Sequence, residues 1–89
     1  MALILLTTSA FERDLRRVGK QGKDLDKLEK VVDALQAGSR LPASCHPHAL
    51  RGNWAGHWDC HVGPDWLLLY KITERELILV RTGSHAELF

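Results

Sequence analysis

The 89-residue sequence lacks any apolar run that is long enough to cross a membrane, and the run near its start covers only residues 2–6. Its two cysteines, Cys45 and Cys60, are too few for a disulfide framework. Its formal net charge is only +1, so overall charge gives no argument for nucleic-acid binding. These shortages argue against a membrane protein and a disulfide-rich secreted domain. Because no export signal is visible either, we expect a cytoplasmic protein.

Apolar residues make up 45% of the chain and charged residues 26%, which predicts one soluble globular domain over residues 1–89. The basic residues are unevenly distributed, because five of them lie between positions 13 and 23 with Asp14 as the single acid. Such a stripe can contact the phosphates of RNA, although a solvated helix face is the alternative. The stripe consists of Arg13, Arg16, Arg17, Lys20 and Lys23.

The first half of the chain predicts one strand and two helices. Residues 2–6 form a short apolar run that is typical of a strand. Ser9 and Glu12 have the spacing of a capping box, which predicts that the first helix starts there. Asp24 can cap a second helix, and Gly38 is placed where a C-terminal helix glycine belongs. The second helix carries an apolar stripe made of Leu25, Leu28, Val31, Val32 and Leu35.

The second half predicts a long loop over residues 39–56 and then three strands. Residues 57–62 alternate, so His61 should point to the face opposite Cys60. Residues 66–72 are apolar nearly throughout, and residues 76–82 form the last strand. We therefore expect an α+β fold, with two N-terminal helices after a short first strand. Both helices should pack on one face of an antiparallel sheet of about four strands.

Three histidines and one acid are positioned to meet on the sheet face that the helices leave free. They are His48 in the long loop, His61, Asp65 in the following turn and His85 just after the last strand. Imidazole and carboxylate groups move protons near neutral pH. RNA cleavage by its own 2′-hydroxyl needs a base, an acid and positive charge, so we expect no metal or other cofactor.

Three further residues are candidates for substrate contacts. Arg81 can stabilise charge on the transition state, and Trp66 and Phe89 can stack on bases. Ordinary structural roles remain open for each, namely ion pairing for Arg81 and packing for the two aromatic residues. A zinc site is a further alternative, built from Cys45, Cys60 and the nearby histidines, although the usual paired ligand spacing is missing.

At these residues the chain resembles the YafQ branch of the RelE-type bacterial toxins over essentially its whole length. The order and spacing of several stretches carry the resemblance, and the C-terminal one matches particularly well. These stretches are 15–17, 22–25, His48 with 50–54, 59–61, 64–71 and 81–89. Small departures occur next to His48, where Pro47 and Ala49 stand, and also at His57, Trp58 and Gly63.

The resemblance implies a compact RelE-like domain and a toxin of a type II toxin–antitoxin system. It implies an endoribonuclease that cleaves mRNA in the ribosomal A site, and a cognate antitoxin that binds and blocks it. Such complexes are usually heterotetramers in which the antitoxin supplies the DNA-binding part. The motif match assigns catalysis to His48, His61, Asp65 and His85, and places Phe89 at the same end. Two alternatives stay open: a ribosome-independent RNase, and a non-catalytic module that binds a partner.

Overall fold

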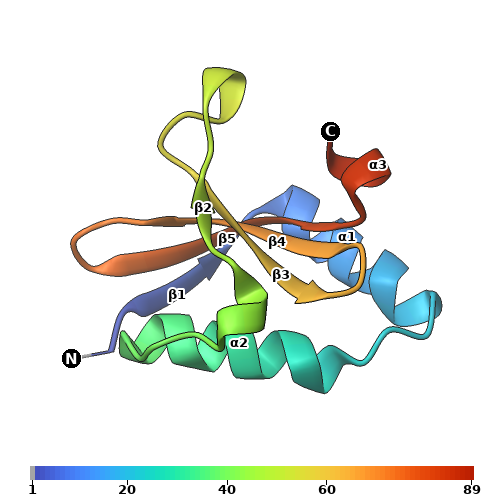
Figure 1. Ribbon diagram of the computed structural model, residues 1–89, viewed down its shortest axis with the longest axis horizontal. Coiled ribbons are helices and arrows are strands. Elements are labelled where there is room, and N and C mark those ends of the chain that lie inside the picture. The colour runs from blue at the N-terminus through green and yellow to red at the C-terminus, as the bar shows by residue number, and fades with distance from the viewer. Residues whose placement is uncertain (1) are drawn as a thin grey trace.

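The computed structural model describes residues 2–89 and contains a five-stranded sheet with helices on both faces (Figure 1). No helix in this range is both long and apolar enough to cross a membrane. In chain order the elements are β1 (Ile4–Thr7), α1 (Ser9–Lys20), α2 (Leu25–Ala37), η1 (Ala43–Cys45), β2 (His48–Ala49), η2 (Gly52–Trp54), β3 (Trp58–Gly63), β4 (Trp66–Ile72), β5 (Glu76–Gly83) and α3 (His85–Leu88).

The helix ends follow local capping chemistry. Asp24 caps α2 by accepting a hydrogen bond from the backbone N–H of Asp26, and Gly38 ends it in the left-handed conformation, so both predictions are confirmed. The cap of α1 is Thr8 rather than Ser9, because the Thr8 side chain accepts from the Phe11 N–H. Thr8 also donates to the carbonyl of Val80, which fixes the start of α1 against β5.

The strand order is β1-β5-β4-β3-β2. The α+β prediction is confirmed, but the sheet is mixed, because β1 pairs parallel to β5 while the other neighbours are antiparallel. The strand that was not predicted is β2, which lies inside the predicted loop and is only two residues long. A pairing this short has no alternating pattern to detect in the sequence.

The main core fills the space between the sheet and the two long helices. The α2 residues Leu28, Val31, Val32 and Leu35 pack with sheet residues such as Leu68 and Tyr70. A smaller cluster covers the opposite face, where Leu67 and Leu69 contact Leu88 of α3. The face that was expected to be free of helices is therefore partly covered. The short helix α3 extends from the end of β5 over this second face (Figure 1).

Candidate active site

Three of the four predicted catalytic side chains meet at the end of the sheet where β3 turns into β4. His61 pairs with Leu67 across the sheet, so its ring lies on the α3 side, as predicted. Asp65 occupies the β3–β4 turn with a positive φ of 46°, and His85 is the first residue of α3. Residues far apart in the sequence are thus brought together by one turn and one short helix.

Asp65 and His85 form a direct pair. One Asp65 carboxylate oxygen accepts from the backbone N–H of His85 at 3.0 Å and lies 2.8 Å from Nδ1 of its ring. The backbone and ring hydrogen bonds from His85 hold the pKa of Asp65 below its usual value. An ionised carboxylate only accepts hydrogen bonds, so Nδ1 must carry the shared proton. The other ring nitrogen, Nε2, is left for a substrate.

His61 stands in the middle of a row of three imidazoles. Its ring centroid lies 6.0 Å from that of His85 and 6.1 Å from that of His46. His46 was not among the predicted catalytic residues, since nothing in the local sequence pattern sets it apart. His48 pairs with Asp59, so the same antiparallel register extended by two residues brings His46 opposite His61. This strand register could have identified His46, but it cannot be read from the sequence.

His48 forms the second histidine–carboxylate pair of the site. It lies opposite Asp59 on the neighbouring strand, with Nδ1 3.5 Å from a carboxylate oxygen of Asp59. The side chain of His48 is 64% exposed while that of Asp59 is 14% exposed, so the imidazole is the accessible partner. Because positions 59 and 61 share one face of β3, His48 is a diagonal neighbour of His61. Asp59 was not among the predicted site residues.

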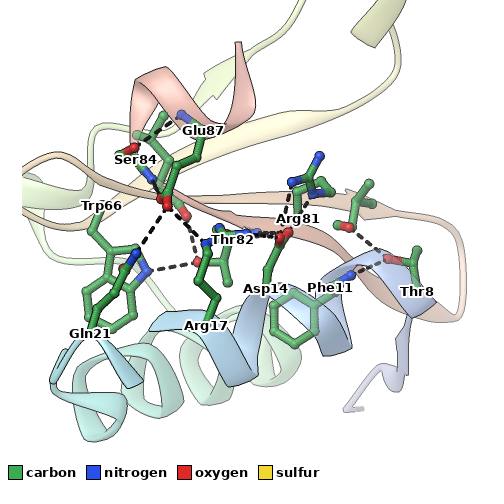
Figure 2. Close-up of polar contacts among 12 residues, drawn as sticks. Thr8, Phe11, Asp14, Arg17, Gln21, Trp66, Arg81, Thr82, Ser84 and Glu87 are labelled. Carbon is green, nitrogen blue, oxygen red and sulfur yellow. Dashed lines mark hydrogen bonds and ion pairs between the residues drawn. The ribbon is translucent and has the colours of Figure 1, made fainter. Parts of the chain in front are cut away.

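Helix α3, which carries His85, is held in place by side chains at both its ends. Ser84 and Glu87 form a capping box in which each accepts the other's backbone N–H. The Glu87 carboxylate also forms an ion pair with Arg17 of α1, 3.0 Å from its Nε, and accepts from Gln21 at 3.1 Å. Figure 2 shows Glu87 between Ser84 and the side chains of Arg17 in α1 and of Gln21 just after it. Helix α1 therefore positions His85 indirectly.

Gly83 allows this close approach of α3 to α1. A Cβ atom at this position would lie 2.6 Å from Nη2 of Arg17 and 2.9 Å from Oε1 of Glu87. A side chain here would displace the ends of Arg17 and Glu87, and the φ of 156° at Gly83 is a conformation that other residues rarely adopt.

A buried carboxylate lies behind this contact. Asp14, which is 2% exposed, binds Arg17 and Arg81 and accepts the backbone N–H of Thr82 (Figure 2). Burial alone would raise the pKa of Asp14, but hydrogen bonds from Arg81, Thr82 and Arg17 outweigh burial and keep this pKa below its usual value. The same hydrogen bond to Asp14 raises the pKa of Arg81. Arg81 is thus the partner of a buried acid, and not a free cation beside the histidines.

The two aromatic candidates have different surroundings. Trp66 is 3% exposed, and its indole N–H donates to Thr82 at 2.9 Å, so its ring belongs to the core. The prediction that Trp66 stacks on a base is therefore wrong. Phe89 is 57% exposed and packs edge-on against Trp54, with ring centroids 6.4 Å apart. Phe89 can present a ring face to a ligand.

The basic stripe is divided by the fold. Arg13, Arg16 and Lys20 lie on the exposed face of α1, at steps of three and four residues. Arg17 points inward to Asp14 and Glu87, so its role is structural. Lys23 lies beyond the helix, with its ammonium group 5.7 Å from the centre of the Trp66 ring. The predicted stripe therefore offers only part of its charge to a surface ligand.

The zinc alternative finds no ligand set, since residues 2–89 contain no group of three His, Cys, Asp or Glu side chains that could hold a metal ion. Cys45 and Cys60 are both buried free thiols. Burial is the main cause that raises the pKa of Cys60 to about 12, which opposes formation of the thiolate that binds zinc.

Comparison with known proteins identifies a family for this chain. Residues 4–89 match the family model described as bacterial toxin of type II toxin–antitoxin system, YafQ. The mRNA interferase toxin YafQ of Escherichia coli strain K12 is 41% identical over 80 residues, which cover 89% of this chain and 87% of that protein.

Two solved structures have the same fold. YafQ from E. coli strain BL21(DE3) superposes with a TM-score of 0.93 at 36% identity, covering 98% of each chain. The structure of the E. coli DinJ–YafQ toxin–antitoxin complex gives a TM-score of 0.91 at 37% identity and covers 100% of this chain and 99% of the matched chain. Because the family model, the curated relative and the solved structures agree, the chain belongs to the YafQ family of bacterial toxins of type II toxin–antitoxin systems.

Proposed function

We propose that this toxin is an endoribonuclease that cleaves mRNA in the ribosomal A site by metal-free acid–base chemistry and so stops translation. The observation that carries the proposal is the row of imidazoles at one end of the sheet, which ends in His85 held by a carboxylate. A second carboxylate-bound histidine, His48, lies on the neighbouring strand. Such a row provides separate groups to take a proton from the 2′-hydroxyl and to give one to the leaving 5′-oxygen.

His85 is assigned as the general acid. Asp65 holds Nδ1 of His85 and so aims Nε2 outward, where it can protonate the departing 5′-oxygen. Asp65 is poorly suited to act as the base, because a carboxylate with a lowered pKa is a weak proton acceptor at neutral pH. Its role is to orient His85.

His48 is assigned as the general base, with Asp59 as the carboxylate that orients it. His61 lies beside both catalytic histidines and can contact the non-bridging oxygens of the scissile phosphate, where negative charge builds up. Phe89 is exposed at the same end of the molecule, and stacking on a base is worth about 1–3 kcal/mol.

The toxin works with two kinds of partner in this proposal. The ribosome presents the mRNA in the cytoplasm, and the exposed residues Arg13, Arg16 and Lys20 contact ribosomal RNA phosphates. A cognate antitoxin binds and blocks the toxin, with a heterotetramer as the expected complex and DNA contacted only through the antitoxin. The DinJ–YafQ complex of the E. coli relative supports this part.

The test is to express the chain alone in a bacterium and to map the 5′ ends of cellular mRNA. Wild type should arrest growth and produce new ends within codons of translated frames, whereas His85→Gln should produce neither. His57→Gln is the matched control, because His57 lies outside the histidine row and contacts Trp54. Equal cleavage by His85→Gln and wild type would refute the catalytic assignment.

Assays on the purified protein test the two alternatives, a ribosome-independent RNase and a non-catalytic module that binds a partner. Cleavage of naked RNA at the rate measured on programmed ribosomes would favour a ribosome-independent RNase. A wild-type chain that cleaves neither substrate, and is not toxic alone, would favour a partner-binding module.

A further inference from the structure

A groove of about 540 Å³ opens beside the histidine row, between α2, η1 and the end of β3. Its walls come from segments that the fold brings together, because both α2 and η1 contact β3. Apolar side chains form much of the surface, among them Val31, Pro42, Val62 and Pro64. A volume of this size suits a small organic group rather than a single ion.

The charge of the groove is entirely of one sign. Lys27 and Lys30 of α2 line it, and none of the lining residues carries a carboxylate. Both lysines are exposed, and neither forms an ion pair within residues 2–89. Their spacing puts them on one helix face about 4.5 Å apart along the axis, so their ammonium groups can meet the same or adjacent anions.

The groove is continuous with the proposed catalytic centre, because His61 lines it as well as standing in the histidine row. Lys23 extends the line of positive charge, since it lies four residues before Lys27 and acts electrostatically on Asp65. A polyanion that reaches His61 from this side therefore meets ammonium groups along α2 and apolar surface beneath them.

We propose that this groove binds the RNA strand next to the scissile phosphate, with a backbone phosphate held by Lys27 and Lys30 and the nucleoside against the apolar floor. The inference rests on the proposed function, because it gives the cleaved strand a second contact. Substrate RNA fits better than a peptide, because the groove joins positive charge to apolar surface and leads to His61 of the proposed phosphate-cleaving site. Neither lysine touches the reacting atoms, so the contact should affect binding and leave the chemical step unchanged.

The decisive experiment measures cleavage of mRNA on programmed ribosomes by wild type, by K27Q/K30Q and by the control Lys71→Gln. Lys71 is an exposed lysine on β4, distant in the sheet from His61. We expect the KM of K27Q/K30Q to rise about tenfold with kcat unchanged. The plot of log kcat/KM against log salt should lose about 0.7 of slope for each phosphate contact removed. Unchanged KM and salt slope would overturn the proposal.

Neutral methylphosphonate linkages at single positions of the mRNA identify which RNA the lysines touch. When the neutral linkage is at the contacted position, wild type and K27Q/K30Q should have equal KM values, because neither protein then meets a phosphate charge there. A defect of K27Q/K30Q that persists with every modified mRNA would mean ribosomal RNA is the ligand, which overturns the assignment to the substrate strand.

A binding assay keeps this inference separate from the proposed function. A short fluorescent RNA with 2′-deoxy substitutions cannot be cut, so its affinity for the isolated protein is independent of catalysis. If wild type fails to cleave any mRNA, the proposed function fails, while weaker binding of this probe by K27Q/K30Q than by Lys71→Gln still supports the groove. Equal binding by both variants would refute it.

Discussion

Asp14→Asn is the sharpest test of how the fold holds its active site. Asn keeps the size of the side chain but loses the negative charge, and it replaces one carboxylate oxygen with an amide donor. In the native protein that carboxylate accepts from Arg17, Arg81 and the Thr82 backbone. The variant would leave Arg81 without its ion-pair partner and Arg17 with Glu87 as its remaining carboxylate, and it would bring donors face to face.

We expect Asp14→Asn to lower the free energy of unfolding by about 3 kcal/mol. Breaking a fully buried pair typically costs about 3–5 kcal/mol. The lower end applies to Asp14, because the side chains of Arg17 and Arg81 are 34% and 27% exposed and can recover part of their hydration. For a domain of this size, 1 kcal/mol shifts Tm by about 4–8 °C, so Tm should fall by roughly 12–24 °C. Urea unfolding gives the free energy, and exposed Asp33→Asn, the control, should change it by less than about 0.5 kcal/mol.

The pH dependence checks the cause of that loss. The pKa of Asp14 is below its usual value of 3.8 in the folded state. Its ionised form therefore stabilises the fold at pH values above its unfolded pKa, and this contribution disappears as the pH falls through the lower folded pKa. The stability gap between wild type and Asp14→Asn should be full at pH 7 and narrow below about pH 4. A gap under about 1 kcal/mol at pH 7, or one that stays constant into acid, would refute the assignment.

Two further predictions concern the anchoring of α3 and the orientation of His85. Gly83→Ala should destabilise the protein by about 1–3 kcal/mol and reduce cleavage, because its Cβ would collide with the Arg17–Glu87 ion pair; unchanged thermal unfolding and activity would contradict this. Asp65→Asn should lower kcat by about 10²-fold or more with little change in Tm. Because hydrogen bonds from His85 lower the pKa of Asp65 from its usual value of 3.8, the wild-type cleavage profile above about pH 5 should not report the titration of Asp65. An acid limb above that pH that Asp65→Asn removes would contradict the lowered pKa, and an unchanged kcat in this variant would contradict the role in orienting His85.

The sequence predicted the elements whose signals are local. The apolar stripe of α2 repeats at helical spacing, and its members from Leu28 to Leu35 are buried as expected. Asp24 and Gly38 act within one turn of the residues they cap, so their types alone marked the helix ends. Alternation along β3 correctly put His61 on the face opposite buried Cys60.

What the sequence did not reveal depends on distant contacts. Asp14 stands in a basic segment and reads as an exposed acid, yet its partner Arg81 lies 67 residues further along the chain. The apolar run 66–72 left core packing open for Trp66, but its hydrogen-bond partner Thr82 lies 16 residues away and could not be identified from the local sequence. Helix α3 was missed because it is only four residues long, although Ser84 and Glu87 have the capping-box spacing that could have indicated it.

The two histidine–carboxylate pairs differ in a way that suits opposite chemical roles. Asp65 is exposed and holds His85 with two hydrogen bonds, which fixes both the ring and the start of α3. Asp59 is largely enclosed, and the longer 3.5 Å contact leaves the exposed His48 ring more freedom to approach a ribose hydroxyl. A base must follow the 2′-hydroxyl as the RNA turns toward in-line attack, while an acid needs one fixed direction to the leaving oxygen. An imidazole held by two hydrogen bonds on α3 and one held by a single longer contact on the two-residue β2 meet these unequal demands. This difference is why we assign the acid to His85 and the base to His48 rather than the reverse.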